Sequence, residues 1–289
     1  MTVTTAYTPE WFYMLEESEA SLRAGSVKRI PHIGTLYLSP QYPLWDLGNC
    51  LFLNTDDPAT LELPRSVLVD AAQEALIALN AIFDGQPRAP FFLMSGDSGI
   101  SHAVKERWVD VLGELGYGVD EPEESHCLTL HRSQLPQLQA MASRWEPARV
   151  RRATTADFDD VLATEPGDED ALGWRTEKVR NMLQRPVDVS AVYVIYDETK
   201  RPVSRFYAVK CVDPSVAYIA RVNTLDDARR KGHAQGVLVR GLLDLFEAWP
   251  NLMEVALLEN EPGPEKLYES FGMVKRGSRY DNEFTKRSP

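Results

Sequence analysis

Apolar residues in the second half of the chain follow a strand pattern first and a helix pattern afterwards. Val189–Tyr196 and Pro202–Val212 are rich in β-branched and aromatic residues and flank the turn-forming Asp197–Lys200, which predicts a hairpin. Val216–Thr224 predicts a third strand. From Ala234 onward the apolar residues recur at helical spacing, so we expect an amphipathic helix with one face on a sheet.

The remaining pattern of this half completes an α+β fold. Met253–Leu258 predicts a buried strand, Pro264–Phe271 a helix, and Met273 begins a final strand. Val150–Ala153 predicts a short strand at the start. This order predicts a mixed, mostly antiparallel twisted sheet flanked by helices.

The first half repeats the same plan. Leu51–Asn54 predicts a strand, Val67–Phe83 an amphipathic helix, Phe91–Met94 a strand and Val104–Leu115 a second helix. At 289 residues the chain accommodates two ordinary domains. We place the boundary after the segment Pro136–Pro147, which gives domains 1–147 and 148–289.

Charge differs between these halves and narrows the classes of partner. Residues 1–147 hold 9 basic against 20 acidic residues, a net charge of −11, whereas 148–289 hold 22 against 23, a net charge of −1. An acidic first half repels phosphate backbones, so we expect no nucleic-acid partner. The nearly neutral second half still allows positive charge to gather at one anion site.

Cysteine usage and the N-terminal pattern indicate the compartment. The cysteines Cys50, Cys127 and Cys211 are odd in number and widely spaced, which predicts no disulfide framework. No signal-peptide pattern and no apolar stretch of bilayer-spanning length is evident. We therefore expect a cytoplasmic protein without a membrane partner. Cys127 and His131 lack a second ligand pair, so no metal site is expected.

A basic, glycine-containing loop precedes the long predicted helix. Arg229–Ala234 reads Arg-Arg-Lys-Gly-His-Ala and follows the strand that ends at Thr224. The N-terminus of a helix leaves backbone N–H groups unpaired, and small residues at Gly232 and Ala234 let a pyrophosphate approach those donors. The alternative interpretation is a basic helix cap with a glycine for the turn.

Two motifs in this half resemble a known family. Arg-x-x-Gly-x-Ala at Arg229–Ala234, after a strand ending Val222-x-Thr224, resembles the acetyl-CoA motif of the GNAT N-acetyltransferase superfamily. Asn260, followed by Leu-Tyr-Glu-Ser-Phe-Gly-Met at Leu267–Met273, resembles its second signature. The resemblance covers residues from about 148 to the end. It implies acetyl-CoA as co-substrate and transfer of the acetyl group to a primary amine by direct attack.

The resemblance also implies roles for individual residues. Val222 and Thr224 would pair their backbone with the pantetheine arm, which Asn260 would also contact. Tyr268 would lie near the thioester sulfur. The residues that would hold the pyrophosphate are Arg229, Arg230, Lys231, Gly232, His233 and Ala234.

Tyr268 and Glu259 are the candidate catalytic residues. The phenol of Tyr268, with a pKa of about 10, can protonate a departing thiolate, although the same pattern fits a tyrosine that only packs on the sheet. Glu259 is the nearest candidate base because Val216–Thr224 holds no carboxylate. A water chain or an amine of lowered pKa is the alternative. The second motif is one residue longer than usual, with Pro262–Pro264 inserted, which can displace Asn260 from its contact.

The first half is predicted to be a degenerate copy without cofactor. In an ungapped comparison of the long helices, Gly232 falls on Glu62, Ala234 on Pro64 and Arg229 on Ala59, while Tyr268 is replaced by Leu112. A glutamate repels a pyrophosphate, and a proline removes a donor. An unrelated α+β domain is the alternative.

Two functions remain open at this point. One is an N-acetyltransferase whose acceptor is a small cationic amine suited to the acidic first half, although that acidity equally serves solubility alone. The other is a non-catalytic protein that senses acyl-CoA or another ligand. A fold does not specify the acceptor. The chain is expected to be a monomer acting as an internal pseudo-dimer, or a homodimer.

Overall fold

The computed structural model divides into two compact units. It describes residues 25–40, 49–54, 57–84, 90, 92–96, 99–121, 123–165, 172–211 and 213–287. Unit 1 comprises residues 1–126 with 277–289, and unit 2 comprises residues 127–276. Each unit holds its own hydrophobic core.

These units do not follow the boundary that the sequence predicted at residues 147 and 148. Strand β6 (Glu123–His131) and helix α5 (Leu135–Ala142) place Leu128, Leu130 and Leu138 in the core of unit 2. The sequence predicted a short helix plus a connection in this segment, so the helix itself agrees with the prediction. The last strand, β12 (Val274–Lys286), leaves unit 2 and belongs to unit 1 from Gly277 onward.

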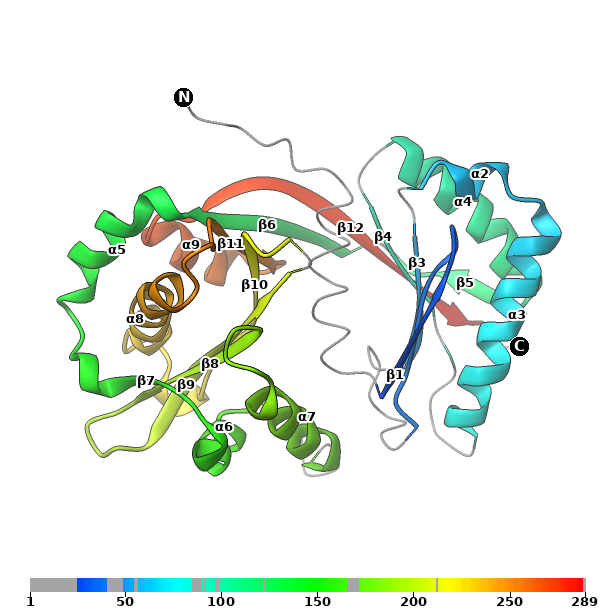
Figure 1. Cartoon of the computed structure of the whole chain (residues 1–289). Coiled ribbons are helices and arrows are strands. Elements are labelled where there is room, and N and C mark those ends of the chain that lie inside the picture. The colour runs from blue at the N-terminus through cyan, green and yellow to red at the C-terminus, as the bar shows by residue number, and fades with distance from the viewer. Residues whose placement is uncertain are drawn as a thin grey trace. The chain divides into compact units, whose positions relative to one another are not determined.

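The sheet of unit 2 runs in the order β6-β11-β10-β9-β8-β7 (Figure 1). Strands β7 to β10 pair antiparallel in sequence order, whereas β10 and β11 are parallel and are connected through helix α8. The strand bounds are β7 Val150–Arg152, β8 Ser190–Tyr196, β9 Pro202–Lys210, β10 Val216–Thr224 and β11 Glu254–Glu259. The hairpin and the mixed sheet are as predicted.

Helix α8 (His233–Ala248) is the centre of the core of unit 2. Its apolar face, which includes Val237 and Leu242, is fully buried. Gly241 allows the helix to approach Tyr193 and Phe206, whose rings stack with centroids 5.0 Å apart. The other helices are α6 Phe158–Ala163, α7 Leu172–Gln184 and α9 Pro262–Ser270.

Unit 1 repeats the same order of elements. Strands β1, β2 and β3 pair antiparallel, β3 and β4 are parallel on either side of helix α3, and β4 pairs antiparallel with β12. The bounds are β1 Ser26–Ile30, β2 Gly34–Leu38, β3 Cys50–Leu53, α2 Ala59–Glu62, α3 Arg65–Phe83, β4 Phe92–Gly96, α4 Gly99–Glu114 and β5 Tyr117–Val119. Both units therefore have the α+β plan that the sequence predicted.

Helix α3 is, among the described helices, the one long and apolar enough to cross a membrane by length and composition. The sequence pattern had not indicated such a helix. Leu68, Ala72 and Leu79 of this helix lie fully buried in the core of unit 1. Core helices of soluble proteins satisfy the same test, so the observation is weak evidence for a membrane span.

Candidate active site

The cleft begins where strands β10 and β11 stop pairing. Their parallel register runs from Val216 opposite Glu254 to Tyr218 opposite Ala256, although β10 continues to Thr224. The pairing of β10 with β9 shifts between Ala220 and Asn223. Arg221, within this bulge, has a left-handed φ of 59°. A bulge bends its strand, so the end of β10 turns out of the ladder and leaves a backbone edge open.

Three side chains hold this bulge, two of them from β9. One Nη of Arg205 donates to the Arg221 carbonyl at 3.2 Å, and the Ser204 hydroxyl donates to the Asn223 carbonyl at 2.7 Å. The side-chain amide of Asn223 donates to the backbone carbonyl of Thr164 at 2.6 Å. Thr164 is the residue that follows α6. The backbone of the bulge is thus held by side chains where ladder hydrogen bonds are absent.

A buried ion pair holds Arg205 in place. The Glu165 carboxylate accepts hydrogen bonds from Arg205, Lys178 and, at 2.8 Å, the Tyr207 hydroxyl. Burial alone would raise the pKa of Glu165, but the charges of Arg205 and Lys178 outweigh it and lower that pKa to about 2. Neither sequence motif revealed this group. Arg205, in an otherwise apolar strand, was the one signal that a buried partner had to exist.

The basic loop presents unpaired backbone donors. Arg230 and Gly232 adopt left-handed φ angles of 62° and 80°, and Gly232 is the N-cap of α8. The first hydrogen bond of the helix runs from the Gly236 amide to the Gly232 carbonyl at 2.9 Å. The amides from Arg230 to Gln235 make no backbone hydrogen bond within the described residues. Such a run of N–H groups at the positive end of a helix favours an anion.

The three basic side chains of the loop take different directions. Arg229 forms an ion pair with Asp226 at 2.9 Å and donates to the Thr224 carbonyl at 3.3 Å. Lys231 donates to the Asp227 carbonyl at 3.0 Å. Within the described part of the chain, the Arg230 side chain has no hydrogen bond or ion pair and remains available to a ligand.

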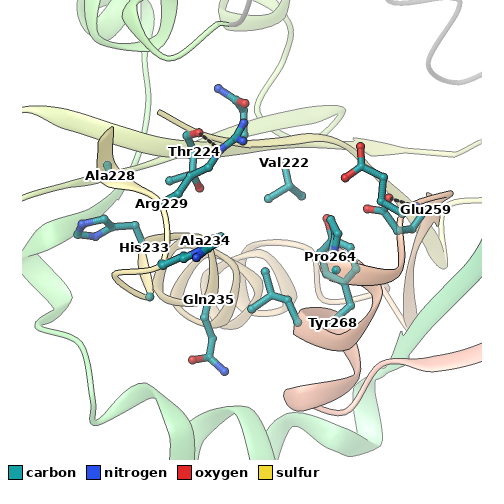
Figure 2. Close-up of a pocket in the computed structure, with 16 residues that line it drawn as sticks. Val222, Thr224, Ala228, Arg229, His233, Ala234, Gln235, Glu259, Pro264 and Tyr268 are labelled. Atoms are coloured by element: carbon teal, nitrogen blue, oxygen red, sulfur yellow. Dashed lines mark hydrogen bonds between the residues drawn. The ribbon is translucent and has the colours of Figure 1, made fainter. Parts of the chain in front are cut away.

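A cavity of about 680 Å³ lies between the open edge of β10, the loop, α8 and α9. Figure 2 shows Arg229, His233 and Ala234 on one side, Glu259 and Tyr268 on the other, and Val222 between them. Its other lining residues are Asn223, Thr224, Ala228, Arg230, Gly232, Gln235, Glu261, Gly263, Pro264 and Leu267. All but two of the site residues predicted from the sequence therefore line this cavity.

Lys231 and Asn260 are the two predicted residues that do not line this cavity. Lys231 lines a neighbouring cavity, because the left-handed residues on either side of it turn its side chain away. Asn260 is exposed, and its backbone amide bonds to the Glu259 carboxylate at 3.0 Å. Helix α9 begins directly after it at Pro262, within the insertion that made its position uncertain in the sequence.

Glu259 and Tyr268 lie together at one side of the cavity and interact electrostatically. The Glu259 carboxylate accepts hydrogen bonds from the backbone amides of Asn260 at 3.0 Å and Glu261 at 2.9 Å. Burial raises the pKa of Glu259 above its usual range. Burial, followed by the neighbouring carboxylate of Glu259, raises the pKa of Tyr268. The pair joins a proton acceptor of raised basicity to a donor phenol.

His233 is buried at the start of α8 and lines the cavity. Burial lowers its pKa first, and the charge of Arg149 lowers it further. The neutral imidazole is consistent with the structural or phosphate-facing role that the sequence suggested.

The corresponding segment of unit 1 differs in the residues that the structure describes. Strands β3 and β4 pair from Leu51 to Leu53, through the last residue of β3. Helix α2 occupies the segment before α3, and Arg107 donates to the carbonyls of Leu61 and Leu63 there. Pro64, which lacks an N–H, is the N-cap of α3.

Comparisons with solved structures match nearly the whole chain. A conserved protein of unknown function from Staphylococcus epidermidis superposes with a TM-score of 0.60 at 13% identity, covering 92% of this chain and 96% of that one. A GCN5-related N-acetyltransferase from Kribbella flavida gives 0.57 at 15% identity, with 96% of each chain covered. A tandem GNAT protein from the clavulanic acid biosynthesis pathway gives 0.50 at 12% identity, over 78% and 70% of the two chains.

No protein-family model and no curated protein matches the chain in sequence. At these identities the structural likeness establishes the fold. The chain therefore has the fold of the GNAT N-acetyltransferase superfamily, in its tandem form.

Proposed function

We propose that this protein is an acetyl-CoA-dependent N-acetyltransferase whose active site is the cavity of unit 2. The observation that carries the proposal is that one cavity joins an anion-binding loop to a proton-transfer pair. The unpaired amides before α8 lie on one side and Glu259 with Tyr268 on the other (Figure 2). This arrangement suits an elongated ligand with phosphates at one end and a reactive group at the other.

The described residues fit acetyl-CoA in three respects. Gly232 and Ala234 leave room for a pyrophosphate against the amides of the loop, and Arg230 supplies an unpaired positive charge. Val222 and Thr224 lie on the open edge of β10, where an extended amide-containing arm can pair with the backbone. Asn260 has no part in this fit.

Bound acetyl-CoA supplies an acetyl thioester as the group to be transferred. The Glu259 carboxylate, with its raised pKa, takes the proton that the attacking amine loses as its nitrogen bonds to the acetyl carbon. The Tyr268 hydroxyl gives its proton to the departing sulfur and recovers one from the neighbouring Glu259 carboxyl. For the neutral amine, protons therefore balance within this pair of side chains. A cationic acceptor first loses one further proton to the solvent, which gives the neutral nucleophile.

The proposed acceptor is a small cationic amine. Glu259 and Glu261 both line the cavity near Tyr268, and two acidic side chains at that position favour an ammonium group over an anionic acceptor. Unit 1 is proposed to bind no acetyl-CoA, since Pro64 removes a backbone donor before α3 and Arg107 already donates to the carbonyls of Leu61 and Leu63 there.

Isothermal titration calorimetry of the full chain with acetyl-CoA tests the proposal, followed by a thiol-release assay over a panel of primary amines. We expect one binding site per chain and release of CoA with at least one amine. Two sites would contradict the degenerate status of unit 1. No binding at millimolar acetyl-CoA would refute the function altogether. Binding without turnover would instead indicate an acyl-CoA sensor.

A further inference from the structure

A second cavity, of about 470 Å³, lies beside the basic loop of unit 2. Two of its lining residues, Ala228 and His233, also line the first cavity, so the two spaces meet at the loop. Lys231 of the loop also lines it, and its remaining walls come from residues outside the loop motif. Arg144 and Trp145 follow α5, Arg149 precedes β7, and Arg201 ends the turn between β8 and β9.

The charge of this cavity is opposite to that of the chain. Arg144, Arg149, Arg201 and Lys231 line it against two carboxylates, Asp197 and Glu198, in a protein of net charge −12. Burial and the nearby cations, with Arg149 the foremost, lower the pKa of His233. Because these cations disfavour the protonated form of His233, the electrostatic potential at its side chain is positive.

Several of the cationic donors lack an acidic partner within the described residues. Arg201 is paired with Asp227 at 2.7 Å and also contacts Asp197. By contrast, Arg149 donates its Nε to the Tyr196 carbonyl at 3.0 Å and forms no ion pair with any residue that the structure describes. Lys231 contacts only a backbone carbonyl, and the Arg144 side chain makes no hydrogen bond among the residues that the structure describes.

Trp145 adds a fixed polar and aromatic surface. Its indole lies against the first turn of α8, where a Cβ built on Gly236 would come within 2.8 Å of the ring. The Arg240 guanidinium holds the Trp145 carbonyl at 3.1 Å. The indole N–H, which lies near Gly232, donates to no acceptor in the described part of the chain. It is therefore a positioned donor beside the loop.

We propose that this second cavity binds a phosphate monoester, namely the 3′-phosphate on the ribose of the coenzyme. The proposal rests on the function proposed above. Coenzyme A carries two anionic groups on one ribose, the pyrophosphate at one carbon and the phosphate monoester at another. The two cavities likewise meet at Ala228 and His233, with unpaired donors on both sides. Arg149, Lys231 and the Trp145 indole N–H are the donors that would hold the monoester.

Calorimetric titration of the full chain with acetyl-CoA and with acetyl-dephospho-CoA tests this inference. Charge-assisted hydrogen bonds to a phosphate predict that acetyl-CoA binds at least about tenfold more tightly. The double variant Arg149→Gln with Lys231→Gln should bind both coenzymes with affinities that agree within about twofold. A matched control, Arg180→Gln with Lys275→Gln, removes the same charge from exposed positions of unit 2 and should keep the preference.

The outcomes separate this inference from the proposed function. Equal affinity of the unaltered chain for both coenzymes would overturn the inference and leave the acetyltransferase proposal intact. Failure of both coenzymes to bind would remove both. If inorganic phosphate binds at this cavity while acetyl-dephospho-CoA occupies the first, and the preference for acetyl-CoA is absent, the monoester comes from a separate ligand and the inference is wrong.

Discussion

The guanidinium of Arg205 links the buried carboxylate of Glu165 to the backbone carbonyl of Arg221. One Nη donates to Glu165, and the other reaches Arg221 at 3.2 Å. Arg205 is fully buried, and Lys178 contributes a second cation to the same carboxylate. The bulge that opens the cleft therefore depends on a charged group outside both sequence motifs.

The first prediction concerns acid stability. The pKa of Glu165 falls from 4.5 to about 2 on folding, so its stabilising contribution is complete above pH 4.5 and is lost as the pH falls toward 2. Its magnitude is on the order of 3 kcal/mol. Denaturant unfolding between pH 6 and 2.5 measures it, with Glu165→Gln as the variant that lacks the titrating group.

Glu165→Gln should lose stability at pH 7, by about 3–5 kcal/mol, because Arg205 and Lys178 would remain buried without their counter-charge. Its stability should then change less between pH 5 and 2.5 than that of the unaltered chain. If the free energy of unfolding changes with pH equally in the variant and in the unaltered chain, Glu165 does not titrate in this range. Lys178→Met, which leaves the Arg205 pair in place, should be milder.

The second prediction concerns the Glu259–Tyr268 pair. Tyr268→Phe keeps the buried ring but removes the proton donor, so kcat should fall by about 10²–10⁴-fold while the Kd for acetyl-CoA stays within about twofold. Stopped-flow or thiol-release kinetics and calorimetry measure the two quantities. A variant with unchanged kcat would show that Tyr268 is only a packing residue.

The third prediction is a pH profile. Burial raises the pKa of Glu259, so the carboxylate needed to take the amine proton forms above pH 4.5, and kcat/KM should rise through this raised pKa. The Glu259→Gln variant should have a lower kcat/KM, and its kcat/KM should not show this rise with pH. The raised pKa also means that the ionised carboxylate destabilises the fold at neutral pH, so Glu259→Gln should be at least as stable as the unaltered chain. If the same rise of kcat/KM with pH remains in that variant, the pKa belongs to another group.

Local patterns in the sequence anticipated the loop and the long helix well. A left-handed glycine before an amphipathic helix is determined by neighbouring residues, so Gly232 and the start of α8 were predictable. Glu259 and Tyr268 were identified by a motif of similarly short range, and the structure brings both to one cavity. Their chemical roles stay predictions.

Features that depend on residues far apart in the chain could not be predicted from the sequence. Whether β6 joins the sheet of unit 2 is decided by its pairing partners and by the burial of Leu128 and Leu130, which no local pattern encodes. Likewise, the partner of a buried charge such as Arg205 comes from another element, 40 residues away in the chain at Glu165. The domain boundary was misplaced for the same reason.

The fourth prediction separates backbone geometry from charge in the loop. Asparagine and aspartate tolerate a left-handed φ best among residues with a side chain, so Gly232→Asn and Gly232→Asp should both fold. Only the aspartate places a negative charge beside the pyrophosphate, which should weaken acetyl-CoA binding at least about a hundredfold. Gly232→Asn should stay within about tenfold of the unaltered chain. Calorimetry compares the three proteins, and equal Kd values for the two variants would remove the loop from the phosphate site.

The fifth prediction tests the packing that holds the loop and the sheet together. A Cβ on Gly241 of α8 would lie 2.5 Å from Phe206 and 2.8 Å from Tyr193, both of them fully buried. Gly241→Ala should therefore lower the free energy of unfolding by about 1–3 kcal/mol, despite the higher helix propensity of alanine. A Cβ on Gly173 of α7 would meet no described atom within 4 Å, so Gly173→Ala should be neutral or slightly stabilising. Denaturant unfolding of the two variants makes the comparison, and equal stabilities would mean that α8 can move away from the sheet at little cost.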